Sequence, residues 1–232
     1  MTRELTIAID GPSSSGKGTV ARTVARDLSY QYIDTGAMYR AVALFSRRYD
    51  VLWDDEPGVS AVARSLEFRF GWDGDVLRIL VNDLDVTAEI RQGDVGQGAS
   101  KVSALPLVRS ALLQVQRDLA DRGGVVMDGR DIGTVVLPDA DLKIYLDAEL
   151  DERARRRHEE VLRRGDVVSY DDVRASLAER DHRDMNRDVA PLCQADDAVY
   201  VDSTDLTIRQ AARRVGALVD ALRPDQKGVG LP

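Results

Sequence analysis

The sequence predicts an α/β protein built on a parallel sheet of five short strands with helices on both faces. The first observation is that five short apolar runs alternate with segments whose apolar residues recur at helical spacing. The second is a small antiparallel unit between the second and third runs, where Asp73-Gly74 forms a hairpin turn between two alternating segments. A chain of 232 residues is long enough for one such domain with an insertion.

The first elements alternate strictly. Residues 5–9 form a strand, and a glycine- and serine-rich turn then leads into a helix with apolar residues at helical spacing. Residues 30–33 form the second strand, and a helix runs from Thr35, placed as its N-cap, to about Tyr49. A loop and a further helix occupy residues 50–65.

The inserted unit and the second half follow from turn and helix-breaking residues. Three short antiparallel strands cover 66–70, 76–81 and 84–86, and a mostly helical stretch over 89–122 is broken at Pro106. Gly123-Gly124 and Gly165 then each end a helical segment. The remaining strands and helices are expected, in order, at 125–128, 142–146, 149–164, 171–187, 198–201 and 208–222.

Composition excludes several classes of protein. The chain is 44% apolar and 31% charged, and no apolar run approaches the roughly 18 residues of a membrane span. The first strand begins almost at once, so we expect no signal peptide. Cys193 is the single cysteine, which fits a reducing cytoplasm, and with only two histidines a zinc site is not expected. A net charge of −8 argues against broad binding to nucleic acid or membrane surfaces.

A phosphate-binding loop is predicted between the first strand and the first helix. Residues 11–19 read GPSSSGKGT, and strand, glycine turn and helix in that order are the context that this motif requires. Gly11 and Gly16 allow successive backbone N–H groups to point at an anion, and Lys17 adds a charge that reaches the β- and γ-phosphates. The motif usually has Ser or Thr after the lysine, but here Gly18 stands there and Thr19 follows. The alternative is a glycine-rich turn without a ligand.

Polar residues also follow the other strands. Because ligands gather at the carboxyl ends of parallel strands, the loops after Ile9, Ile33, Met127 and Leu146 should face one crevice. Asp128 ends an apolar strand, where a phosphate-loop enzyme places a carboxylate that helps to hold magnesium. An aspartate that only caps a turn is the alternative. The adjacent Arg130 and Asp131 favour a site, since together they can hold a phosphate and a polar base edge.

Two charged helical segments allow two interpretations each. In the segment 179–188, helical spacing of i, i+3/i+4 and i+7 places three positions on one face: Arg180, Arg183 or Asp184, and Arg187. The arginines of this face could surround an anionic transition state. An exposed helix joined by Arg–Asp pairs is the alternative. The segment 149–164 contains pairs such as Glu149–Arg153 and Glu152–Arg156, which are typical of a solvated helix, yet it could also be a lid.

Five segments together resemble the bacterial cytidylate kinase family. They read IAIDGPSSSGKGT, DTGAMYR, GASKVSALPLVR, MDGRDIGTVV and ERDHRDMNRDVAPL, and the resemblance covers residues 5 to about 220. It implies a P-loop kinase domain over 1–222, with an insertion at about 57–105 that binds the nucleoside monophosphate and a lid at about 149–166. Residues 223–232 would form a flexible tail. The implied reaction is magnesium-dependent transfer of the γ-phosphoryl group of ATP to CMP or dCMP, in a monomer with no nucleic-acid or membrane partner.

The resemblance also implies roles for individual residues. The phosphates of ATP would be cradled by Gly11, Pro12, Ser13, Ser14, Ser15, Gly16, Lys17, Gly18 and Thr19. The CMP site would comprise Thr35, Arg40, Ser100, Arg109, Arg130, Asp131, Arg180, Asp184 and Arg187. Transfer itself would depend on Lys17, Arg130, Arg180 and Arg187. Asp128, directly or through water, and Thr19 are the candidates for holding magnesium.

Two other functions remain to be weighed. One is another P-loop kinase that acts on UMP, AMP or a small alcohol, against which the positions of Asp131 and Arg109 count. The other is a GTPase-type switch, which reads guanine through an Asn-Lys-x-Asp motif. The asparagines are Asn82 and Asn186, and neither is followed by lysine. The sequence leaves open the preference between CMP and dCMP, and the lid arginine that acts on the transferred group.

Overall fold

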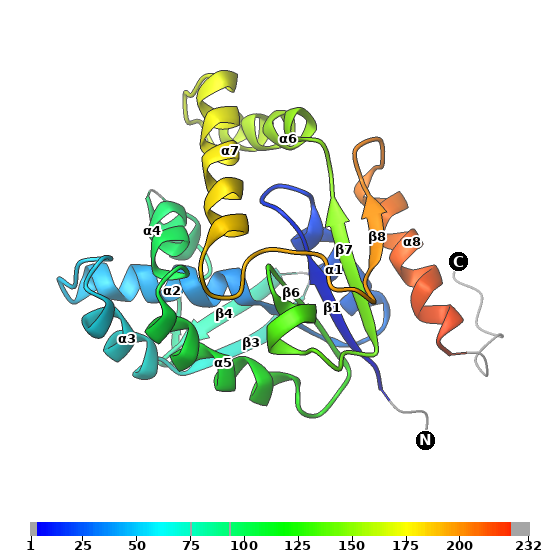
Figure 1. Cartoon of the computed structure of the whole chain (residues 1–232), viewed down its shortest axis with the longest axis horizontal. Helices are drawn as coiled ribbons and strands as arrows, with labels where there is room; N and C mark the ends of the chain where they lie inside the picture. Colours follow the sequence, from blue (N-terminus) through cyan, green and yellow to red (C-terminus); the bar gives the residue numbers. More distant parts are fainter. Residues whose placement is uncertain (1–3, 75, 93, 224–232) are drawn as a thin grey trace.

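A computed structural model describes residues 4–74, 76–92 and 94–223, and its main sheet has the predicted parallel arrangement. Five strands lie in the order β2-β6-β1-β7-β8, and every neighbouring pair is parallel. They are β1 (Thr6–Asp10), β2 (Gln31–Asp34), β6 (Val125–Gly129), β7 (Leu142–Asp147) and β8 (Val199–Asp202). Figure 1 shows the sheet in the middle of the molecule with helices around it.

The strand residues alternate between two apolar clusters, which explains why both faces are covered. Ile7 and Ile9 of β1 face a cluster that includes α1 and α8, whereas Ala8 between them belongs to a second cluster on the opposite face. Val126 and Met127 of β6 divide in the same way. Because successive strand side chains point to opposite faces, a nearly continuous apolar run indicates a strand buried on both sides.

The helices agree with the expected positions to within a few residues. The bounds of the helices are α1 (Lys17–Asp27), α2 (Thr35–Arg48), α3 (Glu56–Arg64), η1 (Glu89–Arg91), α4 (Val95–Val102), α5 (Pro106–Ala120), η2 (Ile132–Val136), α6 (Leu150–Arg163), α7 (Tyr170–Asn186) and α8 (Ile208–Ala221). The short helix η2, a single π-type turn, was not expected from the sequence. Pro106 is the first residue of α5, where its missing N–H costs nothing, so the expected break separates α4 from α5.

The inserted antiparallel unit is also present. Strands β3 (Phe68–Asp73), β4 (Val76–Val81) and β5 (Leu84–Asp85) form a second sheet in the order β3-β4-β5. Phe68 pairs with Val81 and Asp73 pairs with Val76, so the hairpin closes at the predicted turn. The buried side chains of this sheet continue the larger core cluster, which joins the insertion to α2, α4 and α5.

Two local expectations were wrong. Thr35 is not the N-cap of α2; Asp34 is, and its carboxylate accepts the N–H of Ala37 at 2.8 Å. The helix α7 ends at Asn186, so Arg187 lies just beyond it in extended backbone and is not on the helical face. In the described part of the chain, no helix has the length and apolar character needed to cross a membrane.

Candidate active site

A cleft of about 1410 Å³ lies at the carboxyl ends of the parallel strands, where the sequence placed it. The loops that follow β1, β2 and β6 line one side, and α6 and α7, which extend beyond these strand ends in Figure 1, line another. Asp34 and Asp128 are register partners on β2 and β6, and Ile9 pairs with Asp128, so the strand ends are adjacent. The loop after β8, residues 204–208, also lines the cleft and was not expected there.

The phosphate-binding loop has the backbone that its glycines predict. Gly16, the N-cap of α1, has φ +88°, and Gly11 has φ +153°. A Cβ on Gly11 would lie 2.0 Å from the carbonyl oxygen of Leu146 on β7, so only glycine fits there. Lys17 Nζ donates to the carbonyl of Pro12 at 3.0 Å, which holds the ammonium over the loop. Lys17 is also the first residue of α1, so its ammonium lies near the helix N-terminus, which favours an anion.

Lys17 lies among other charges at the base of the cleft. Burial lowers its pKa to about 7, with the nearby guanidiniums of Arg130 and Arg180 acting in the same direction. Burial raises the pKa of Asp128 to about 6, and the neighbouring Asp34 adds to the effect. Each of these two buried groups holds its charge less readily than in water, which favours the binding of an oppositely charged ligand atom.

Asp34, Gly36 and Arg40 line the cleft at the start of α2. Arg40 Nη2 donates to Asp34 Oδ2 at 2.7 Å, so the cation near this helix N-terminus has a carboxylate beside it. A Cβ on Gly36 would lie 3.1 Å from Asp34 Oδ1 and 3.2 Å from Arg40 Nη1. The Thr35 hydroxyl, instead of capping α2, donates to the carbonyl of Asp128 at 2.8 Å and joins α2 to β6.

Arg130 lies between the phosphate loop and α7. Its Nη2 donates to the Ser13 hydroxyl at 2.7 Å, and its Nε donates to Asp184 Oδ2 at 2.8 Å. Burial opposes ionisation of Asp184, but Arg130 and Arg180 together hold its pKa below the ordinary value. Both Asp184 and Arg183 line the cleft, but Asp184 contacts Arg130 whereas Arg183 donates to Ser100 Oγ at 3.0 Å and to Glu179.

The carboxylate of Asp131, in the loop after β6, is held by two arginines. Arg109 of α5 makes a short contact with one carboxylate oxygen, and Arg187 Nη2 donates to the other at 3.1 Å. All three side chains are at most 8% exposed. The Arg109 guanidinium lies 5.7 Å from the centroid of the Tyr39 ring, which fixes it from the other side. Asp131 thus presents a firmly oriented carboxylate to the cleft.

Asp10 supports this loop from below and was missed by the sequence analysis. Its carboxylate accepts the N–H groups of Ile132 and Gly133 at 2.8 and 2.7 Å, which are the first residues of η2. Burial raises the pKa of Asp10 to about 7, although the two N–H groups oppose the shift. The only signal in the sequence was an aspartate at the end of an apolar strand, like Asp128.

Arg180 of α7 lines the cleft and makes no ion pair among the described residues. Its Nε is buried and has no hydrogen-bond partner among the described residues. Burial lowers its pKa to about 10, and the positive charge of Arg130 contributes. A buried guanidinium nitrogen without an acceptor is costly, so this position is suited to an anion.

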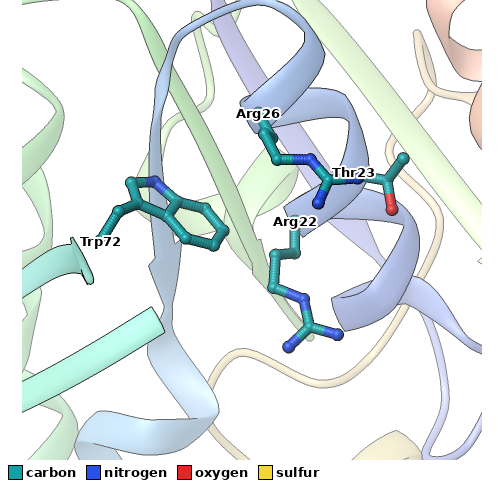
Figure 2. A pocket seen from close by; sticks show the side chains of 4 residues that line it. All are labelled: Arg22, Thr23, Arg26 and Trp72. Atoms are coloured by element: carbon teal, nitrogen blue, oxygen red, sulfur yellow. The ribbon is translucent and has the colours of Figure 1, made fainter. Parts of the chain in front are cut away.

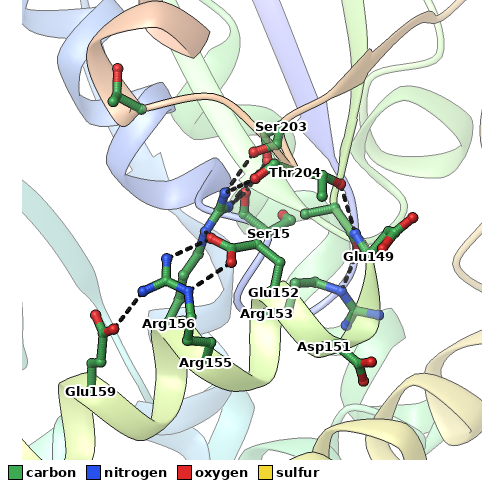
Figure 3. A network of polar contacts seen from close by, with 12 residues as sticks. Ser15, Glu149, Asp151, Glu152, Arg153, Arg155, Arg156, Glu159, Ser203 and Thr204 are labelled. Carbon is green, nitrogen blue, oxygen red and sulfur yellow. Dashed lines mark hydrogen bonds and ion pairs between the residues drawn. The ribbon is translucent and has the colours of Figure 1, made fainter.

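The helix α6 attaches to the phosphate loop through two arginines. Arg153 does not pair with Glu149, as i,i+4 spacing suggested; it is buried, lies 2.5 Å from Asp181 of α7, and donates to the Ser13 carbonyl at 3.2 Å. The expected contact between Arg156 and Glu152 is present at 2.7 Å. Figure 3 shows Arg156 reaching from α6 to the loop after β8, where its Nη2 donates to the Ser203 carbonyl at 2.6 Å.

A second, smaller cavity of about 170 Å³ lies between α1 and the inserted hairpin. It is lined by Arg22, Thr23, Arg26 and Trp72, and Figure 2 shows the indole of Trp72 on one side with the two arginines of α1 on the other. Arg22 also lines the main cleft, so the two cavities are neighbours along α1.

The amino-acid sequence of the chain matches one known family. The family model described as cytidylate kinase matches residues 7–221. The chain belongs to the cytidylate kinase family. Curated cytidylate kinases similar to it include one from Geobacter sp. strain M21, 47% identical over 88% of both chains, and one from Chromobacterium violaceum, 48% identical over 90% of this chain and 92% of the relative. This kinase is therefore a nucleoside-monophosphate kinase that transfers a phosphoryl group from ATP.

Among solved structures, an uncharacterised protein from Eubacterium ventriosum matches this kinase with a TM-score of 0.52. It is 11% identical, and the match covers 94% of this chain and 99% of the other. At that identity the likeness supports the fold of the kinase and nothing further.

Proposed function

We propose that this cytidylate kinase transfers the γ-phosphoryl group of ATP to CMP or dCMP, and that the loop after β6 joins the two substrates. The observation that carries the proposal is the position of two adjacent residues of that loop. Arg130 contacts Ser13 of the phosphate loop, while Asp131 is clamped by two arginines on the other side. One loop therefore supplies a cation beside the donor phosphates and a carboxylate that can read an acceptor base.

ATP would bind along the phosphate loop. The backbone N–H groups of residues 11–19, other than Pro12, which has none, and the ammonium of Lys17 would hold the phosphates at the start of α1. The loop 204–208 lines the cleft beside Gly16, and the side chain of Ile208 would lie 3.1 Å from a Cβ on that glycine. This end of the cleft leaves space for the nucleoside of ATP.

CMP would bind between α2, α4, α5 and α7. Its phosphate would contact Arg40, Arg130 and Arg180. Thr35, Arg109, Asp131 and Arg187 would face the cytosine, whose exocyclic amino group is a donor that a carboxylate accepts and that uracil lacks. Ser100 and Asp184 would lie near the sugar. Both line the cleft, although Ser100 already accepts a hydrogen bond from Arg183.

The chemistry requires positioning and charge more than proton transfer. The phosphate of CMP is already ionised, so it can attack the γ-phosphorus without a general base. Arg40 and Arg130 are each paired with an aspartate, and among the described residues the Nε atoms of Arg40 and Arg180 are buried without a hydrogen-bond partner. Lys17, Arg130, Arg180 and Arg187 would compensate the charge that develops on the transferred group.

The residues present fit a magnesium ion that arrives with ATP. Asp128 Oδ2 lies 3.6 Å from the ideal Cβ position of Gly18, so the carboxylate faces the start of α1. No group of three acidic, histidine or cysteine side chains suited to a metal gathers in the described residues. This agrees with a Mg²⁺ ion held by one carboxylate together with phosphates and waters. Asp128, directly or through water, and Thr19 would hold the ion, which neutralises charge on the phosphates.

We further propose that the enzyme is a cytoplasmic monomer whose partners are nucleotides alone. The proposal rests on the single cysteine and the net charge of −8, and on the expectation that a small-molecule kinase that opens and closes needs no partner chain. One chain has a mass of 25.6 kDa, and a sedimentation equilibrium measurement that gave twice this mass would contradict the monomer.

The test of function is ADP production from ATP and magnesium with CMP, dCMP, UMP, AMP and GMP offered separately. Turnover should be strong with CMP and dCMP and weak with the others. Arg130→Ala should lower it by about 10²- to 10³-fold, as loss of a donor to developing charge does, whereas Arg213→Ala on the exposed face of α8 should not. Preferred turnover of UMP or AMP would replace the cytidylate assignment, and no stimulation by any monophosphate would refute a nucleotide acceptor.

A further inference from the structure

The residue after the motif lysine is glycine for a reason that lies outside the loop. Gly18 is within α1, so its backbone gives no cause for glycine. A Cβ there would lie 3.3 Å from the hydroxyl of Tyr32 and 3.6 Å from Asp128 Oδ2. The first distance is tighter than most real Cβ contacts. The space in which the usual Ser or Thr side chain would sit is therefore bounded by a tyrosine hydroxyl and a carboxylate.

Tyr32 belongs to β2 and lines the cleft, with its hydroxyl close to Gly18 and Asp128. The residue is 4% exposed, and its ring packs in the larger apolar cluster. The hydroxyl donates to Asp128 Oδ1 at 2.8 Å, a contact between neighbouring strands β2 and β6. Burial and the charges of Asp128 and Asp34 raise the pKa of Tyr32 well above its ordinary value, so the phenol stays protonated and donates.

We propose that Tyr32 is a positioning residue that takes the place of the missing loop hydroxyl. By holding Oδ1 of Asp128, it turns Oδ2 toward the start of α1, where the magnesium–nucleotide complex would lie. The proposal rests on the function proposed above and adds to it a residue and a constraint. Residues that orient a metal-binding carboxylate commonly matter as much as the ligand itself.

The test compares the binding of ADP with and without magnesium, measured by titration calorimetry in the presence of Mg²⁺ or of a chelator. Tyr32→Phe keeps the ring and removes the hydroxyl. It should weaken magnesium–ADP binding by about tenfold, while the affinity for metal-free ADP and the KM for CMP stay unchanged. Equal weakening with and without magnesium would mean that the hydroxyl only supports the loop, and would refute the proposal.

A double variant tests the shared space. Gly18→Ser alone should also weaken magnesium–ADP binding, because its Cβ must displace the Tyr32 hydroxyl. Combined with Tyr32→Phe, the serine hydroxyl gains room beside Asp128, so the double variant should bind magnesium–ADP more tightly than either single variant. Effects that simply add would overturn the proposal.

Tyr30→Phe is the matched control. The Tyr30 hydroxyl is also buried, but it accepts the N–H of Leu5 at 2.8 Å, at the other end of the sheet. Its loss should lower the unfolding temperature without changing the ratio of the two ADP affinities. If the wild-type enzyme failed to phosphorylate CMP, the proposed function would fail, but the magnesium dependence of ADP binding would still decide the role of Tyr32.

Discussion

Replacing Asp131 by asparagine should weaken the preference of the enzyme for cytosine over uracil. Arg109 and Arg187 donate to both carboxylate oxygens. Asparagine has only one acceptor oxygen, and the arginines will claim it, because its amide nitrogen cannot accept from a guanidinium. The NH₂ group then faces the base, where it meets the amino donor of cytosine but can donate to the O4 of uracil.

The magnitude has two parts. Loss of one base-reading pair is worth about 1–3 kcal/mol of discrimination, so the ratio of kcat/KM for CMP over UMP should fall by about 5- to 150-fold. The second part is stability. The three side chains are at most 8% exposed, and leaving two buried guanidiniums without their counter-charge costs about 3–5 kcal/mol. For a domain of this size that lowers Tm by about 6–20 °C.

The assay is steady-state ADP production with CMP and UMP, at a temperature well below the Tm of the variant measured by circular dichroism. Both substrates are compared on the same preparation, so a partly unfolded sample lowers both rates and leaves the ratio intact. A ratio unchanged from the wild type, in a folded variant, would refute the assignment of Asp131 to the base.

Three further predictions concern residues around the cleft. Asp10→Asn should lower the free energy of unfolding by about 1–3 kcal/mol, since one buried N–H loses its acceptor, and denaturant unfolding that left it unchanged would contradict this role. Burial raises the pKa of Asp128 to about 6, so the carboxylate is protonated as the pH drops from 7 to 5 and magnesium–ADP affinity should fall. Because the folded state binds this proton more readily than the unfolded state, the free energy of unfolding should rise as the pH falls from 7 toward 3.8. Calorimetry and thermal melts across that range check both signs. Arg153→Met should cost about 3–5 kcal/mol by leaving Asp181 buried and unpaired, and Asp181→Leu in the same chain should recover stability in a thermal melt.

The sequence was sufficient for the sheet and for the place of the site because both follow from local patterns. Apolar runs buried on both sides mark parallel strands, and parallel strands bring their following loops to one edge. Asp128, Arg130 and Asp131 were therefore recognisable before any coordinate was known. Asp184 and Arg109 were assigned to the CMP site only through the resemblance to a family, since they come from helices whose orientation no local pattern determines.

The wrong expectations share one cause: a contact with a residue distant in the sequence is stronger than the contact that local spacing predicts. Thr35 and Asp34 are both good caps, and Thr35 instead bonds the carbonyl of Asp128, 93 residues away. Arg153 has a glutamate at the favourable i−4 spacing, but an exposed pair of that kind is worth only about 0.3–0.5 kcal/mol. A buried guanidinium requires a buried carboxylate, and Asp181 of α7 provides it.

The same requirement explains how an acidic chain can keep a cleft rich in arginine. Arg40, Arg130 and Arg109 are held in place by carboxylates before any nucleotide binds. Without those partners, the buried positive charges would repel one another and destabilise the fold. A bound phosphate then either displaces one of these carboxylates from its arginine or binds beside the existing ion pair. Arg180 differs in making no ion pair among the described residues, and its Nε, like that of Arg40, is buried without an acceptor, so an incoming anion gains most at Arg180.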